Sequence, residues 1–468
     1  MATSLRIRFE GAARTVTGSR HHLFWGERSG LFDCGLFQGP RDEAERINRN
    51  FAFEPSQLDA MVVSHAHLDH TGNLPTLVAG GYGGRIHMTP ATADLSRFML
   101  ADSAFLQEKD VEHVNKHARG RPPRRPLYTP ADVEATLERI DTHEYHAPWE
   151  LWPGATVEYF DAGHILGSAI TTYTFEQNGR QFRLAMGGDL GRANRPILQD
   201  PEQLQGIDAL VLESTYGNRV HQDTAETERQ LIEIVERTVQ RGGRVLVPSF
   251  AVGRAQDFVA TLHKLCERGE VCEVPIFVDS PMARSATGVF VRHPELFDAE
   301  TRHLFEHERG APFGFARLRY VSSPDESRAL NDRREPCIIV AASGMCEGGR
   351  ILHHLLHGLG NPRNTVLFVG FQAQGTLGRR IKDGVEKVNV FGEPIQVHAE
   401  VAALDGFSAH ADQNELVAWV TAIKPTPRNI FLVHGELEAA EALAARLKEH
   451  LPTQVHIPEK GQEFDLWT

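Results

Sequence analysis

A run of nine residues near the start of the chain concentrates side chains that can bind metal. Residues 64–72 read Ser-His-Ala-His-Leu-Asp-His-Thr-Gly, and this HxHxDH run holds His65, His67, Asp69 and His70. Imidazoles crowded in a protein core need costly polar partners, and a solvated loop has no need of three histidines. Neutral imidazole nitrogens and carboxylate oxygens are ligands that zinc-type ions prefer. The run therefore indicates a metal site rather than a chance His-rich loop.

Three further ligand-type residues stand at the ends of apolar stretches: His164, Asp189 and His434. Each has a glycine beside it, which lets the backbone approach a metal centre closely. A single histidine at a strand end is more often a structural residue with satisfied hydrogen bonds. Together with the HxHxDH run, however, the three residues are consistent with two ions that share one bridging carboxylate.

Buried strands are expected to position these residues. The apolar stretch 58–63 is bounded by polar residues and predicts a strand whose end carries the HxHxDH run, where open α/β folds place their chemistry. Asn178-Gly179 between two further apolar stretches predicts a β-hairpin. From about Thr224 helical and strand patterns alternate, which is typical of βαβ units on a parallel sheet. After about Phe391 strand patterns return, followed by a last helix over 438–450.

The composition is that of a globular protein of more than one domain. The chain has 468 residues, 41% of them hydrophobic and 24% charged. No apolar run is long enough to cross a membrane, and the N-terminus lacks the pattern of a signal peptide. The five cysteines are odd in number and dispersed, which favours free thiols in a reducing compartment. We therefore expect a cytoplasmic protein.

The net charge of −13 argues against a general nucleic-acid binder, whose surface is usually basic. Carboxylates that hold metals nevertheless count as negative until the ions bind, and an acidic protein can still carry a local basic groove. The segment 117–125 contains four arginines and is one candidate for such a groove. It is equally consistent with a solvated, Pro-rich connector.

The order of these motifs resembles that of one enzyme family. Over almost the whole chain, the sequence resembles the metallo-β-lactamase superfamily and, within it, the β-CASP nucleases. The resemblance rests on Asp33, the HxHxDH run, His164, Asp189, Glu213, His410 and His434. It implies an α/β fold, in which a metallo-β-lactamase αββα sandwich is interrupted by an inserted β-CASP domain with a mainly parallel sheet. We expect the first domain to comprise residues 1–217 and 396–468, and the insertion to comprise 218–395.

The resemblance also implies roles for individual residues. Two Zn²⁺ ions per chain would be held by His65, His67, Asp69, His70, His164, Asp189 and His434, with Asp189 bridging them. Asp33 would orient a ligand or the bridging hydroxide. Glu213 and His410 match the first two β-CASP motifs, and His410 would protonate the departing sugar oxygen while Glu213 holds it. Asp33, Asp69, Glu213 and His410 are the predicted catalytic residues.

The function that follows is a zinc-dependent ribonuclease that hydrolyses phosphodiester bonds with a two-metal-activated hydroxide, in RNA processing or decay. His434 stands where DNA-specific members usually have valine, so the resemblance is to the RNA-processing branch. The expected substrate is single-stranded RNA, with no membrane partner, and the sequence leaves a homodimer open. It also leaves open endonuclease against 5′-to-3′ exonuclease action.

Two segments and one serine are candidates for phosphate contacts. Ser343 and Gly344 lie between a strand and a helix, and Arg379 and Arg380 end the stretch 370–380. That stretch superficially resembles a P-loop but lacks the Gly-Lys-Ser/Thr ending, so nucleotide triphosphate binding is rejected. Ser408, two residues before His410, is the third candidate.

Two alternative functions remain open at this point. The same scaffold serves metallo-hydrolases of small substrates such as thioesters, lactams or small phosphodiesters. The long insertion between Glu213 and His410 argues against these enzymes, which are generally shorter. The third hypothesis, a non-enzymatic scaffold subunit, would require broken metal motifs, whereas every ligand position here is filled.

Overall fold

The computed structural model describes residues 4–117, 123–271, 274–308, 312–370 and 372–467. Its chain contacts divide it into two compact units. The first unit comprises the chain up to Ala193, Asp200–Val220, and the chain from His410 onward. The second unit comprises Asn194–Gln199 and His221–Ala409. The second unit thus interrupts the first, as the sequence pattern suggests.

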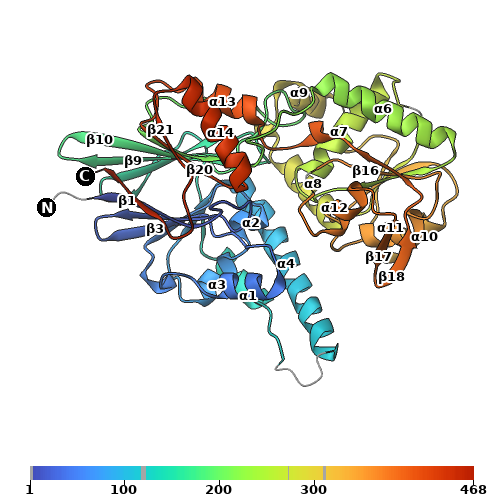
Figure 1. The fold of residues 1–468 in the computed structure, drawn as a ribbon, viewed down its shortest axis with the longest axis horizontal. Coiled ribbons are helices and arrows are strands. Elements are labelled where there is room, and N and C mark those ends of the chain that lie inside the picture. The colour runs from blue at the N-terminus through green and yellow to red at the C-terminus, as the bar shows by residue number, and fades with distance from the viewer. Residues whose placement is uncertain (1–3, 118–122, 272–273, 309–311, 371, 468) are drawn as a thin grey trace. The chain divides into compact units, whose positions relative to one another are not determined.

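Two seven-stranded sheets form the centre of the first unit (Figure 1). In spatial order, the first sheet consists of β22 (Glu463–Trp467), β1 (Leu5–Gly11), β2 (Arg20–Trp25), β3 (Arg28–Phe32), β4 (Ala60–Val62), β5 (Ile86–Met88) and β6 (Ile140–Thr142). The second consists of β21 (Gln454–His456), β20 (Asn429–Val433), β11 (Ala209–Glu213), β10 (Arg180–Met186), β9 (Ala169–Gln177), β8 (Ala155–Asp161) and β7 (Trp149–Trp152).

The inward faces of both sheets share one hydrophobic core. Leu5, Ile7 and Phe9 alternate along β1 and pack in the same cluster as Val157 and Tyr159 of β8. Alternation with a period of two is what buries one face of a strand. Each such side chain contributes about 1.5–3 kcal/mol when it is fully buried. Strands from both ends of the chain are held together by this core.

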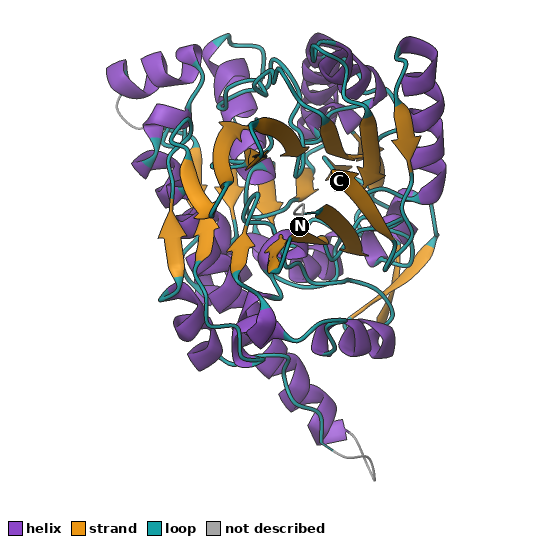
Figure 2. Cartoon of the chain, turned by 90° about the vertical axis from the view of Figure 1, so that its left-hand side faces the viewer, coloured by secondary structure: helices purple, strands orange, loops and turns teal. Residues whose placement is uncertain are grey.

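Helices cover the outer faces of the sheets, so the unit is an αββα sandwich (Figure 2). α13 (Gln413–Thr421) and α14 (Leu437–His450) pack Leu416 and Leu443 against the second sheet. α3 (Leu74–Ala79) packs Leu77 against the first sheet. The remaining helices of this unit are α1 (Arg41–Arg49), α2 (Leu68–Thr71), α4 (Pro90–His117) and α5 (Pro130–Leu137), with a 3-10 turn, η1, at Pro55–Gln57.

The predicted hairpin is confirmed. Strands β9 and β10 pair antiparallel across Asn178 and Gly179, whose φ angles are 52° and 73°. Two consecutive residues with positive φ are the signature of a type I′ turn, for which Asn-Gly is the preferred pair. Two strands after the last helix, β21 and β22, were not predicted from the sequence.

The second unit is built on a six-stranded parallel sheet. Its order is β14 (Leu318–Tyr320), β13 (Ile276–Val278), β15 (Cys337–Ala341), β12 (Arg244–Pro248), β16 (Thr365–Phe368) and β19 (Glu400–Ala403). A separate hairpin joins β17 (Lys387–Val390) and β18 (Glu393–Gln396). The mainly parallel sheet that the βαβ pattern predicts is present.

Helices cover both faces of this parallel sheet. The helices within His221–Ala409 are α6 (Thr224–Gln240), α7 (Arg254–Glu267), α8 (Pro281–Arg292), α9 (Ala299–His307), α10 (Pro324–Asp332), α11 (Ile351–Gly358) and α12 (Leu377–Lys382). Short 3-10 turns lie at η2 (Pro294–Leu296) and η3 (Asp405–Phe407).

The contact division differs from the boundaries expected from the sequence. It falls at Val220 rather than at residue 217, and at Ala409 rather than at residue 395. The physical reason for the second difference is β19, which pairs in register with β16 and so continues the sheet of the second unit to Ala403. The strand pattern after Phe391 therefore belongs to the inserted unit, not to the returning sandwich.

The basic segment 117–125 is described only in part, because residues 118–122 lie outside the described ranges. Of the rest, the Arg124 guanidinium forms ion pairs with Asp42 at 2.7 Å and with Glu45 at 3.3 Å. Acidic partners thus offset the charge of Arg124, which favours the connector interpretation at this position.

Candidate metal centre

Strand ends at one edge of the two sheets carry the predicted ligands. Strands β10, β11 and β20 are parallel, and Glu213 pairs in register with Val433. Asp189 follows β10 by three residues and His434 follows β20 directly. Because parallel strands in register end at the same edge, residues far apart in the sequence are brought together there.

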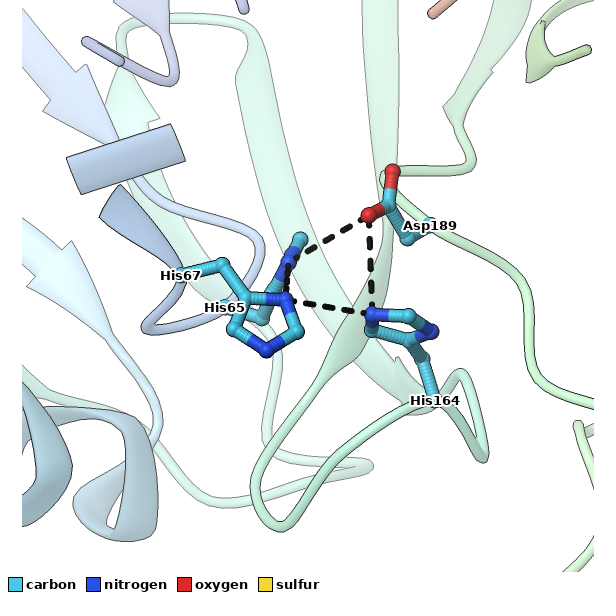
Figure 3. A group of neighbouring side chains, drawn as sticks. All are labelled: His65, His67, His164 and Asp189. Carbon is cyan, nitrogen blue, oxygen red and sulfur yellow. Dashed lines mark hydrogen bonds and ion pairs between the residues drawn. The ribbon is translucent and has the colours of Figure 1, made fainter. Parts of the chain in front are cut away.

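The first group of ligand atoms comes from His65, His67, His164 and Asp189, whose side chains point toward a common centre (Figure 3). His67 Nδ1 lies 3.2 Å from His65 Nε2 and 3.3 Å from His164 Nε2. Asp189 Oδ2 lies 3.5 Å from His65 Nε2 and from His164 Nε2. Three imidazoles and one carboxylate oxygen thus enclose one position.

The second group comes from Asp69, His70 and His434, with the other oxygen of Asp189 beside it. The Nε2 atoms of His70 and His434 are 3.2 Å apart, and His434 Nε2 is 3.3 Å from Asp69 Oδ2. Asp189 Oδ1 lies 3.4 Å from His70 Nε2. Asp189 therefore directs one carboxylate oxygen at each group, the arrangement that a bridging ligand needs.

These distances fit metal coordination. Two ligand atoms bound 2.0–2.1 Å from a tetrahedral zinc ion are separated by about 3.3 Å. The spacings in both groups, 3.2–3.5 Å, lie close to this value. His65, His70, His164 and Asp189 are almost fully buried, and buried ring nitrogens that face one another need a shared cation or proton between them. The residues present therefore fit a divalent metal.

Burial and the close approach of these side chains shift their pKa values. Burial, reinforced by nearby His70, lowers the pKa of His65 well below its ordinary value, and burial lowers that of His67 to about 4. Burial alone would raise the pKa of Asp189, but the surrounding histidines outweigh it and hold this pKa well below the ordinary range. Neutral imidazoles and an ionised carboxylate are the protonation states that bind metal.

Asp33 holds His70 in place. Its Oδ2 lies 2.7 Å from His70 Nδ1, and its Oδ1 accepts a hydrogen bond from the backbone of Ser64 at 2.8 Å. An N–H at Nδ1 leaves Nε2 of the same ring as the atom that faces the second group. Burial opposes a charge on His70, but Asp189 and Asp33 outweigh burial and raise its pKa well above the ordinary value.

Three hydroxyl residues that the sequence interpretation missed also support the ligands. Ser64 Oγ lies 3.0 Å from Asp33 Oδ2 and 3.0 Å from His65 Nδ1. The backbone amide of His164 donates to Ser168 Oγ at 3.0 Å, and Thr215 Oγ1 lies 3.2 Å from His434 Nδ1. Ser64 and Thr215 are next to recognised motifs, which was the available signal.

Glu213 and His410 form a pair beside these groups. His410 Nδ1 is 3.1 and 3.0 Å from the two carboxylate oxygens of Glu213 and 3.8 Å from Asp189 Oδ2. The backbone amide of Leu190 donates to Glu213 Oε1 at 2.7 Å, which fixes the carboxylate. A carboxylate that holds one imidazole nitrogen leaves proton transfer to the other nitrogen of the ring.

The predicted phosphate-contact residues lie in the second unit and are not part of these groups. The helix after β15 begins only at Ile351, so Ser343 and Gly344 do not contribute to its first turn. Arg379 forms an ion pair with Asp383 at 2.8 Å, whereas Arg380 is exposed. Phe371, within the predicted stretch 370–380, lies outside the described residues.

Ser408 belongs to the same set of predicted contacts. Its side chain is buried, and its Oγ has no hydrogen-bond partner among the described residues.

Models of three protein families match successive parts of the chain. The Metallo-beta-lactamase superfamily matches residues 26–157, the Beta-Casp domain 255–381, and the Zn-dependent metallo-hydrolase RNA specificity domain 394–458. Among curated proteins, Ribonuclease TTHA0252 of Thermus thermophilus is 39% identical over 443 residues, which are 95% of this chain and 96% of the relative. The chain belongs to the β-CASP family of metallo-β-lactamase ribonucleases.

The comparisons also include a relative with another name and a solved structure with a similar fold. Transcription termination factor FttA of Methanocaldococcus jannaschii is 32% identical over 97% of this chain and 70% of the relative. A solved structure of a protein of unknown function from Enterococcus faecalis V583 is 12% identical, with a TM-score of 0.57 over 99% of this chain and 100% of that one, and shows a similar fold. The predicted family, fold class and enzyme class, a nuclease, are thereby confirmed.

No helix within the described ranges is both long and apolar enough to span a membrane.

Proposed function

We propose that this β-CASP protein is a zinc-dependent ribonuclease that cleaves single-stranded RNA, with two zinc ions per chain. The observation that carries the proposal is the shared position of Asp189, which directs one oxygen at each of two ligand groups with metal-like spacing. The match to a Zn-dependent RNA specificity model and the similarity to a named ribonuclease support zinc and RNA.

The proposal assigns each residue of the two ligand groups to one of the two ions. His65, His67, His164 and Asp189 hold one ion, and Asp69, His70, His434 and Asp189 hold the other. When bound, such ions generate a nucleophile from water near neutral pH and offset the charge that gathers on the phosphate. Asp33 orients His70 through its Nδ1.

In this proposal the Glu213–His410 pair protonates the leaving group. The departing sugar oxygen is a poor leaving group and needs a proton in the transition state. Glu213 binds His410 Nδ1 and stabilises the charged imidazolium, so His410 donates the proton from Nε2. The backbone contacts of Leu190 and Ala411 hold the two segments side by side at this point.

The test is cleavage of a 5′-labelled single-stranded RNA by zinc-loaded protein, with DNA of the same sequence beside it. We expect RNA cleavage that is lost in His410→Ala and in Asp189→Asn, with zinc content reduced only in the second variant. Mononucleotide products would identify exonuclease action and a ladder would identify endonuclease action.

The competing assignment is a metallo-hydrolase of small substrates on the same scaffold. If two zinc ions per chain are measured and neither polymer is cut, the ribonuclease proposal fails and the small-substrate enzyme takes its place. If no metal binds to the purified protein, both assignments fail.

A further inference from the structure

A second cluster of ligand-type side chains lies in the first sheet and shares no residue with the centre described above. It consists of His87 on β5, Asp141 on β6 and His143 just after β6. The two strands are parallel neighbours, and His87 pairs in register with Asp141. Residues paired in register, and residues two apart along a strand, project from the same face. The three side chains therefore converge by the geometry of the sheet itself.

The distances within the cluster are close to those of a metal site. His87 Nδ1 lies 2.9 Å from His143 Nε2, and Asp141 Oδ2 lies 3.7 and 3.8 Å from these two nitrogens. Around a tetrahedral ion each separation would be about 3.3 Å. Small shifts that change the three separations by about 0.4–0.5 Å reach that value. Asp141 can make its shift because its side chain is half exposed, at 50%.

Stacking and backbone hydrogen bonds fix the positions of His87 and His143. The indole of Trp149 stacks on His143 with ring centroids 3.8 Å apart and an interplanar angle of 10°. The backbone amide of His143 donates to the Met88 carbonyl at 3.0 Å, and Tyr159 donates to the His87 carbonyl at 2.9 Å. Burial lowers the pKa of His87 to about 4 and also lowers that of His143, so both rings are neutral at pH 7.

We propose that His87, Asp141 and His143 form an additional metal site for a divalent ion of the zinc type, with solvent completing its coordination. Two imidazoles and one carboxylate suit Zn²⁺ and its neighbours in the transition series. The two histidines are mostly buried, with side chains 13% and 17% exposed, while Asp141 opens toward solvent. An ion can therefore enter from the Asp141 side.

An ion at this site would brace the segment that positions one ligand of the main centre. Tyr145, two residues after His143, donates its hydroxyl to the Ser168 carbonyl at 2.7 Å. Ser168 Oγ accepts the backbone amide of His164 at 3.0 Å. The site would tie the edge strand β6 to β5 and stiffen this connection, so its role is structural rather than catalytic.

Trp149 provides a local reporter for the test. Metal-depleted full-length protein is titrated with Ni²⁺, a paramagnetic ion that quenches nearby indoles, and Trp149→Phe isolates the signal of this residue. We expect quenching in the wild-type protein that is absent in Trp149→Phe and His143→Gln. Prior addition of Zn²⁺ should prevent it. His146→Gln is the matched control, because His146 is exposed and pairs with Glu202 instead.

Because His143→Gln alters a stacked ring, Asp141→Asn serves as a second variant that leaves both imidazoles in place. In this variant, the Zn²⁺ concentration that halves the quenching of Trp149 by Ni²⁺ should be at least about tenfold higher than in the wild type. Equal zinc content and equal quenching in the wild type, His143→Gln and Asp141→Asn would overturn the proposal.

The outcome is independent of the proposed function. A His65→Ala/His67→Ala double variant should lose RNA cleavage but keep the quenching of Trp149. Loss of that quenching in the double variant would show that the Trp149 signal comes from the main centre, and the additional site would be rejected.

Discussion

Glu213 contacts His410 through both carboxylate oxygens, which lie 3.1 and 3.0 Å from the same ring nitrogen, Nδ1. The Glu213 side chain is fully buried and is also held by the backbone amide of Leu190. A buried carboxylate that accepts from an imidazole favours the protonated ring. In the proposed mechanism this pair supplies a proton next to Asp189.

Glu213→Gln should lower kcat for RNA cleavage by about 10²–10⁴-fold, because the amide cannot stabilise the charged ring of the general acid. The zinc content should not change, since Glu213 lies outside both ligand groups in the proposal. Single-turnover cleavage of a labelled RNA measures kcat, and zinc analysis of the same protein measures the metal content. An unchanged kcat would show that Glu213 does not act through His410.

Asp33→Asn should weaken metal binding by about 10–100-fold, because it removes the charged acceptor that holds His70 Nδ1. Competition with a chromophoric zinc chelator measures the affinity directly. Asp59→Asn is a suitable control, because Asp59 forms an ion pair with Arg28 of β3 and belongs to neither of the two ligand groups found among the described residues. Equal affinities in the two variants would contradict the role assigned to Asp33.

Asp161 should make the protein less stable as the pH rises from about 4 to about 7. Burial, opposed by a hydrogen bond from Gly163 and reinforced by Glu202, raises the pKa of Asp161 to about 7. The folded state thus retains a proton that the unfolded chain releases near pH 4, so this stabilisation is complete below pH 4 and is lost through pH 7. The loss amounts to at most about 4 kcal/mol.

Asp161→Asn should remove this component, because the amide oxygen can still accept from Gly163 without ionising. Urea unfolding at pH 5 and pH 8 gives the free energy of unfolding of both proteins, and the difference between wild type and variant at each pH measures this component. The variant should gain stability relative to the wild type at pH 8. A variant that is equally destabilised at both pH values would show that Asp161 does not titrate in this range.

Arg380→Ala should weaken RNA binding and reduce the slope of log K against log salt by about 0.7, the contribution of one contact to a single-stranded phosphate. Arg379 is already paired with Asp383, so Arg379→Ala should change this slope less. Binding of a labelled RNA by anisotropy at several salt concentrations measures both. Identical slopes in Arg380→Ala and the wild type would exclude the contact.

The sequence alone determined the family, the nuclease class and most of the local structure. The HxHxDH run places four side chains of ligand type within six residues, so their proximity follows from local spacing rather than from folding. The sequence also predicted the Asn178-Gly179 turn and the buried strands that precede these residues, because turn preference and apolar patterning act over a few residues.

Only the tertiary structure decided which distant residues meet. His70 and His434 are 364 positions apart, yet their Nε2 atoms lie 3.2 Å from each other because β4 and β20 end at the same edge of the sandwich. The pairing of β22 with β1, of β19 with β16, and the contact of Ser168 with His164 are long-range or loop contacts of the same kind. Sequence patterns report local conformation and burial, whereas the packing of one shared core selects the partners of each strand.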